Sequence, residues 1–153
     1  QIKQELARGL IQGEGYQKMA RRMRDRIEVD MNKTLRIART EGHRVIEESS
    51  YDSLVHAENM GIKAKKRWIA TLDERTRSSH QHLDGETIDI GDRFSNGLLY
   101  PGEASGPPEE IINCRCTTIT IFPDLDPTER RIRGEGIVPY TNYQDWKKNR
   151  LGG

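Results

Sequence analysis

Apolar side chains recur every three to four positions along the first part of the chain, which is the spacing of amphipathic helices. One such stripe runs from Ile2 to Leu10 and stops at Gly13-Glu14-Gly15, because glycine weakens a helix and permits a turn. A second stripe begins at Tyr16 and predicts another helix. Gly61 is expected to end the helical part, since glycine readily adopts the left-handed backbone that follows a helix.

The helix boundaries between these points have two solutions. The second stripe continues past Asp30 and fits either one long helix or two helices that meet there, with Asn32 or Thr34 as the cap of the new start. We predict one helix over Thr34–Ser49 and a further helix that begins at Ser49-Ser50.

After Gly61 the apolar positions alternate with polar ones, which is the period of a strand. Three segments predict strands, although the first also fits a helix. The last is the best strand, because β-branched residues fill it and a proline follows it. Between the first two, Thr76 or Ser78 is suited to begin a short helix that ends at Gly85. The three segments are Ile62–Leu72, Thr87–Phe94 and Ile111–Phe122.

Together these patterns predict an α+β fold, with an N-terminal helical region followed by a small antiparallel β module. The helical region is expected over residues 1–67 and the β-rich module that bears the motifs over residues 68–123. Residues 124–153 are expected to form a polar C-terminal tail, irregular from Asp124 to Gly136, with a small aromatic patch. The patch consists of Ile137, Val138, Pro139, Tyr140, Tyr143 and Trp146.

The composition predicts a small hydrophobic core and much surface that is solvated or covered by partner proteins. Hydrophobic residues make up 33%, aromatic residues 6% and charged residues 32%, so the core is small and an elongated shape or an assembly that completes the core is expected. No segment approaches the ~20 apolar residues of a membrane helix, and no signal-peptide pattern is present, so no membrane partner is expected. The chain starts at Gln1 without a methionine, which suggests a piece of a longer protein.

The charge is balanced but unevenly distributed. With 25 basic and 24 acidic residues, the whole chain is not a polycation that coats nucleic acid. Two local basic clusters are either solvated faces or contacts for the phosphates of double-stranded DNA. The candidate DNA-binding residues are Arg21, Arg22, Arg24, Lys63, Lys65 and Lys66.

The two cysteines, Cys114 and Cys116, are separated by one residue. A disulfide at this spacing is strained, so free thiols and a reducing compartment, the cytoplasm, are expected. If both lie on the strand predicted above, their sulfurs share one face and form a candidate metal set with His80, with His82 or Asp84 as a fourth ligand. These ligand types suit zinc. The alternative is a histidine hydrogen-bonded to backbone beside two reduced thiols.

Charged residues on both sides of His80 raise the question of catalysis. Asp73 and Asp84 flank His80, whose ring titrates near neutral pH, so a metal-dependent hydrolase or nuclease that uses His80 with Asp73 or Asp84 is the alternative function. No residue marks a nucleophile or a substrate pocket, and we therefore predict a protein that is not an enzyme. Arg39-Thr40-Glu41 on a helix is either a surface charge pair or a link to the loop around Asp73.

Three motifs follow one another in a fixed order over about half of the chain. The motifs are Ala38-Arg39-Thr40-Glu41, then Trp68-x-x-Thr71-x-Asp73-x-Arg75-Thr76-Arg77-x-x-His80-x-x-Leu83-Asp84-Gly85, then Pro107-Pro108-Glu109-Glu110-Ile111-Ile112-Asn113-Cys114-Arg115-Cys116. They resemble the phage head morphogenesis domain, the minor head protein family typified by phage Mu protein F. The tail from Arg133 to Trp146 is also similar to the segment C-terminal to the motifs in some members.

The resemblance implies a minor capsid protein in the virion interior near the portal, present in the host cytoplasm during assembly. It implies the phage portal protein, other capsid or scaffolding proteins and packaged double-stranded DNA as partners. Some relatives carry toxin domains after this domain, including ADP-ribosyltransferases, and no such module is recognised here. On this interpretation, structural roles fall to Trp68, Asp73, Arg75, Thr76, His80, Asp84, Gly85, Asn113 and Arg115.

One departure from the family pattern concerns the metal. Many relatives have Cys-x-x-Cys where this chain has Arg77-Ser78-Ser79-His80, so the candidate zinc set is reduced to His80, Cys114 and Cys116. Without a metal, Arg77 is expected to replace the cross-link by an ion pair with Asp73 or Asp84.

Overall fold

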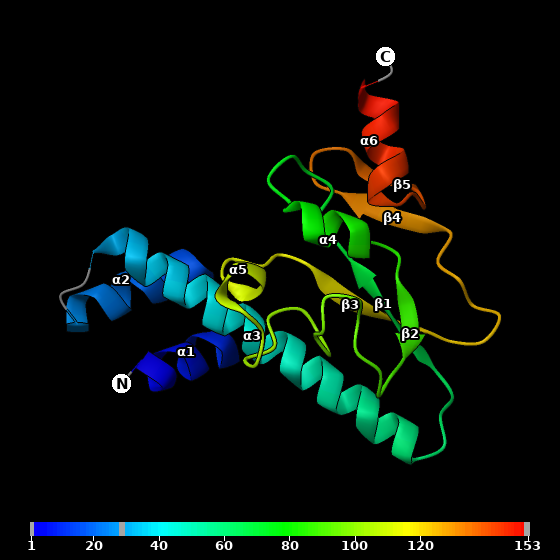
Figure 1. Cartoon of the computed structure of the whole chain (residues 1–153). Coiled ribbons are helices and arrows are strands. Elements are labelled where there is room, and N and C mark those ends of the chain that lie inside the picture. The colour runs from blue at the N-terminus through cyan, green and yellow to red at the C-terminus, as the bar shows by residue number, and fades with distance from the viewer. Residues whose placement is uncertain (1, 28–29, 152–153) are drawn as a thin grey trace.

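The computed structural model describes residues 2–27 and 30–151, with α-helices first and two small antiparallel sheets after them (Figure 1). The predicted α+β class is confirmed. In the described residues, no helix combines the length and apolarity needed to cross a bilayer. The ends of the predicted divisions, residue 1 and residues 152–153, lie outside the described residues.

Two helices pack against a third to form the first core. Helices α1 (Ile2–Ile11) and α2 (Tyr16–Ile27) follow the two predicted stripes and the glycine break between them. Gly9 makes their close contact possible, because a Cβ there would lie 2.2 Å from Met19 Sδ. The buried residues of this core are Leu6, Met19, Ala20, Met23 and Ala38.

Helix α3 (Met31–Asn59) is a single helix of 29 residues, so the predicted junction at Ser49 is wrong. Ser49 and Ser50 are exposed, and serine lowers helix stability only slightly. Buried residues of α3 on the N-terminal side, such as Glu47, and partly buried ones on the C-terminal side, such as Tyr51, hold the helix together. Asp30 is the N-cap, rather than Asn32 or Thr34: its carboxylate accepts from the backbone N–H groups of Asn32 at 2.9 Å and Lys33 at 3.2 Å. Gly61, with φ 92°, follows the helix end as predicted.

The three-stranded sheet has the order β2-β1-β3, with both pairs antiparallel. Helix α3 extends from the other helices past this sheet (Figure 1), where the buried carboxylate of Glu47 accepts from Thr118 N at 3.3 Å. The strands are shorter than the segments that predict them. They are β1 (Lys65–Ile69), β2 (Thr87–Asp89) and β3 (Thr117–Ile121).

The segment before β3 is not a strand, which corrects the prediction of a strand over Ile111–Phe122. Pro108 occupies the first turn of the short helix α5 (Pro108–Ile111), where its missing N–H costs nothing. Asn113 then takes a positive φ of 55°, which asparagine tolerates better than most residues, and this turns the chain. The cysteines therefore lie in a turn that leads into β3 rather than on alternate positions of a strand.

The C-terminal segment is also more regular than predicted. It forms a hairpin of β4 (Glu129–Ile132) and β5 (Gly136–Pro139), followed by helix α6 (Tyr143–Leu151). The expectation that Asp124–Gly136 is irregular is therefore wrong. Arg130 and Ile132 both point inward, and a charged residue at one inward position hid the strand period in the apolar pattern.

Part of the aromatic patch of the tail docks on the β module itself, while Ile137 is 70% exposed. Tyr143 and Trp146 are buried together with Leu72 and Ile132. A larger core next to them surrounds Trp68 and includes Leu83, Phe94, Leu98, Cys114 and Cys116. Since β1 begins at Lys65, it crosses the predicted boundary after residue 67, and the division into three parts stays a prediction.

Candidate functional site

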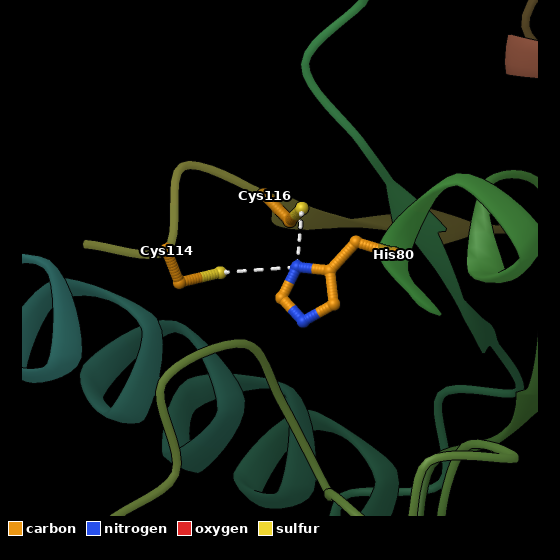
Figure 2. Close-up of side chains that lie close together, drawn as sticks. All are labelled: His80, Cys114 and Cys116. Atoms are coloured by element: carbon orange, nitrogen blue, oxygen red, sulfur yellow. Dashed lines mark hydrogen bonds between the residues drawn. The ribbon is translucent and has the colours of Figure 1, made fainter. Parts of the chain in front are cut away.

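The predicted candidate ligands His80, Cys114 and Cys116 lie together in the core (Figure 2). His80 comes from helix α4 (Ser78–Leu83), and its Nδ1 is 3.2 Å from Cys116 Sγ and 3.7 Å from Cys114 Sγ. One ligand atom from each residue lies within 4.8 Å of the others, and all three side chains are buried. The structure thus groups the three residues, although a turn and not strand alternation does so.

Packing fixes the histidine and the cysteine turn. The Trp68 ring meets the His80 ring edge-on at a centroid distance of 5.2 Å. Cys114 N donates to Ile111 O at 3.2 Å, and Asn113 N donates to Thr40 Oγ1 at 3.1 Å. The turn is therefore attached to α3 through Thr40. The predicted link from Arg39-Thr40-Glu41 was to the loop around Asp73 instead, and Glu41 pairs with Arg44 on its own helix.

A carboxylate orients the far side of the imidazole. His80 Nε2 lies 2.8 Å from Glu110 Oε2, while Ser79 Oγ and Asn96 Nδ2 donate to the same carboxylate at 2.8 Å and 3.2 Å. Burial raises the pKa of Glu110, but these donors outweigh it and the pKa lies below its ordinary value. A carboxylate of this kind holds the histidine of a zinc site in one tautomer.

The pKa values of the two thiols are coupled and shift in opposite directions. The pKa of Cys114 is lowered, first because the Cys116 thiol donates to its sulfur and also because His43 and His80 interact with it. The pKa of Cys116 is raised by the neighbouring Cys114 sulfur and by burial. The pair thus favours the loss of one proton over the loss of two, and the thiolate is the form that binds a cation.

Sequence reasoning missed His43 on α3 as a neighbour of the cysteines. Burial lowers the pKa of His43, but its interaction with Cys114 leads the opposing effects, and the net shift is upward. Its Nε2 is buried and has no hydrogen-bond partner among the described residues. The available signal was its position, one helical turn after Arg39 in the first motif.

The fourth ligands that we predicted from sequence lie elsewhere. His82 is exposed, with its Nδ1 2.6 Å from Ser78 O. Asp84 faces Arg130. A small cavity of about 20 Å³ borders His80, Cys114 and Cys116, which is room for one water molecule or ion.

Asp84 joins three parts of the module. Its carboxylate accepts from Ala70 N at 2.7 Å, from Tyr143 N at 2.7 Å and from the Arg130 guanidinium at 2.7 and 2.9 Å. The Asp84 side chain has no exposed surface and that of Arg130 is 6% exposed. The pair therefore connects the end of β1 to the C-terminal hairpin and helix, and Arg130 was missed because its segment was predicted to be irregular.

Asp73 is held in the same way at the surface. Arg115 binds both carboxylate oxygens, with Nη2 at 2.8 Å from Oδ1, while Arg75 N and Thr76 Oγ1 donate to Oδ1 at 3.0 Å and 3.2 Å. Arg77 forms neither expected ion pair and donates instead to Ile112 O at 2.7 Å. Both aspartates have arginine partners, whereas the carboxylate that contacts His80 is that of Glu110.

The remaining motif residues serve the backbone and the core. Gly85 has a φ of 90°, a conformation that disfavours other residues, and its N–H donates to Trp68 O at 2.9 Å. Trp68 itself is fully buried.

Asp73 makes stability depend on pH. Arg115 holds the pKa of Asp73 well below its ordinary value of 3.8, so its contribution is complete above that value and is lost as the pH falls below it. We expect Asp73→Asn to lower the free energy of unfolding by about 1 kcal/mol near pH 6, since the carboxylate is partly exposed. Near pH 2.5 the loss should be smaller, because the carboxylate of the unfolded chain is then protonated while the native carboxylate is still charged, and this proton uptake on unfolding removes part of the stability that Asp73 contributes.

Urea unfolding at the two pH values measures this difference. Asp89→Asn is the control, because Asp89 pairs with Lys65 at 3.1 Å but its side chain is 66% exposed. An equal loss at both pH values for Asp73→Asn would contradict the assignment.

The candidate DNA-binding residues do not form one surface. Helix α2, which carries Arg21, Arg22 and Arg24, lies away from β1 (Figure 1). Arg22 pairs with Glu5 and Glu14 inside the helical region. Arg24 pairs with Asp25 at 2.8 Å.

The second basic cluster is partly internal. Lys66 is 1% exposed, and its Nζ donates to Leu99 O at 2.8 Å, so it presents no ammonium to a phosphate. Burial lowers its pKa to about 8. Lys65 pairs with Asp89, while Lys63 and Arg21 are exposed. Direct DNA contact stays a prediction for the other candidate residues, and Lys66 is removed from the set.

Comparison with known proteins gives a consistent family. Residues 1–119 match the family model described as Phage Mu protein F like protein. The chain is 34% identical over 158 aligned residues to minor head protein GP7 of Bacillus phage SPP1, which covers 97% of this chain and 50% of that protein. No solved structure is significantly similar to the chain.

Other relatives differ in their names. A protein of Enterococcus faecalis named NAD(+)–arginine ADP-ribosyltransferase EFV is 33% identical over 149 residues, which covers 94% of this chain and 30% of that protein. An uncharacterized protein of Haemophilus influenzae is 34% identical over 90 residues, 59% of this chain and 17% of that protein. The chain thus spans half or less of the length of these relatives.

Proposed function

The chain belongs to the Phage Mu protein F like family, and on that premise we propose that it is the assembly module of a phage minor head protein that docks on the portal. It would act in the virion interior and, during assembly, in the host cytoplasm, with capsid or scaffolding proteins as further partners. The motif residues then hold the module together and carry no catalysis. The ADP-ribosyltransferase name belongs to a relative of which this chain covers 30%, so it does not argue for an enzyme here.

The observation that carries the portal proposal is an exposed apolar surface at one end of the three-stranded sheet. The register pairs Lys65 with Ile121, so the residues before β1 and after β3 are neighbours. Phe122 also bridges to Leu125, which is 69% exposed. Exposed apolar groups that gather in this way mark protein interfaces. The apolar end surface consists of Ile62, Phe122 and Leu125.

We expect Leu125→Asp to weaken binding to oligomers of the portal protein at least about tenfold, because it places a charge in an apolar contact. Surface plasmon resonance against immobilised portal oligomers measures the affinity. Ile137→Asp is the matched control, since Ile137 is 70% exposed but lies on β5. Equal losses in both variants, or no binding by the unmodified chain, would overturn the proposal.

A second proposal concerns a structural zinc ion. Two buried thiols and a carboxylate-oriented histidine form a donor set that suits zinc. His80, Cys114 and Cys116 would hold the ion, and His43 is the nearest candidate for a fourth donor. The ion would cross-link α4 to the turn before β3 and would supply no chemistry to a substrate.

A further inference from the structure

A second hollow, of about 590 Å³, lies between the helices and the β module and is separate from the apolar end surface. Four separate parts of the chain contribute arginines to its wall: helix α3, the loop after β1, the cysteine turn and the β4–β5 turn. The arginines are Arg39, Arg75, Arg77, Arg115 and Arg133.

Few of these cations are neutralised. Within the described residues, Asp73 is the one carboxylate that forms ion pairs with them, binding Arg115 through both oxygens and lying 3.5 Å from Arg75. Arg39 and Arg133 are exposed. A hollow that gathers uncompensated guanidinium groups focuses positive potential on whatever enters it.

One buried guanidinium nitrogen in the same wall has no partner among the described residues. Arg77 Nη1 is buried and forms no hydrogen bond with a described residue. A buried guanidinium N–H without an acceptor is costly, and an anion in the hollow would supply the acceptor.

We propose that this hollow is an anion site that takes a phosphate group. A planar carboxylate can engage both of its oxygens with one guanidinium group, as Asp73 does with Arg115 in this molecule. A tetrahedral phosphate offers more oxygens and accommodates several guanidinium groups that approach from different elements. The phosphate could belong to a nucleic-acid backbone or to a free phosphate, and both present the same oxygens to these arginines.

The test is titration calorimetry of the whole chain with inorganic phosphate at low ionic strength. We expect R39Q/R133Q to bind at least about tenfold more weakly, because two charge-assisted contacts are lost while no ion pair among the described residues is broken. The double variant R36Q/R131Q is the matched control: it removes the same charge from exposed positions of α3 and β4 outside the hollow, and its affinity should change less than about twofold.

Further titrations identify the source of the phosphate. Competition between inorganic phosphate and a short single-stranded oligonucleotide would assign a nucleic-acid phosphodiester, whereas phosphate binding without oligonucleotide binding would assign a free phosphate. Equal losses in the two double variants, no phosphate binding by the unmodified chain, or tighter binding of succinate than of phosphate would overturn the site. Loss of portal binding in Leu125→Asp leaves this result untouched, because Leu125 is not in the wall.

Discussion

Replacing Asp84 with asparagine is expected to lower the free energy of unfolding by about 3–5 kcal/mol, the usual cost of breaking a buried ion pair from one side. The Arg130 guanidinium would stay buried without its counter-charge, and two backbone N–H groups would lose a charged acceptor. Urea unfolding followed by circular dichroism measures the change. A loss of less than about 1 kcal/mol would show that Asp84 does not hold the module together.

The matched control for this variant is Asp126→Asn. Asp126 also pairs with an arginine, Arg67 at 2.6 Å, but its side chain is 72% exposed, so the loss should stay below about 1 kcal/mol. A double-mutant cycle with Arg130→Met adds a second check. If Asp84 and Arg130 act as one pair, the double variant loses much less than the sum of the single losses.

Removal of zinc is expected to have the second large effect. Purified chain should contain about one zinc ion, and a chelator should lower the melting temperature by about 10 °C or more, because metal bound only by the folded state adds its binding energy to folding. Elemental mass spectrometry and a thermal melt with and without chelator measure both quantities. The thiols must lose protons to bind the ion, so its affinity falls as the pH is lowered.

Variants on one short helix separate a metal site from a histidine–thiol cluster. His80→Ala should abolish zinc content, while His82→Ala should retain it, because His82 lies on the same helix but is exposed. Glu110→Gln should weaken zinc binding about 10–100-fold through the orientation of His80. If the purified protein contains no zinc and the chelator does not change its melting temperature, the zinc site is refuted and the three residues form a cluster held by packing.

Retention of zinc in His43→Ala would exclude His43 as the fourth donor. Partial loss would place it in the set, since a structural zinc site commonly has four protein ligands. Either result leaves the grouping of the other three residues unchanged.

The sequence by itself determined the local structure wherever short-range chemistry governs it. The first two helices follow their apolar stripes, Gly61 ends α3, and β1 lies within a segment of alternating residues. The ordered motifs also identified the family, because a series of that length and spacing does not arise from composition. The grouping of His80 with the two cysteines was predicted from ligand type and from a strand that the structure replaces with a turn.

Tertiary structure decided everything that depends on partners distant along the chain. The partner of Asp84 is Arg130, 46 residues later, and the apolar pattern of neither segment predicts that pair. His43 and Glu110 lie close to the cysteine–histidine cluster because α3 and α5 pack around it. The turn at Asn113 is also needed, because it leads the chain from α5 to the two cysteines. Ion pairs and buried polar contacts of this kind are specified by position in space, whereas a sequence pattern reports only the face of its own helix or strand.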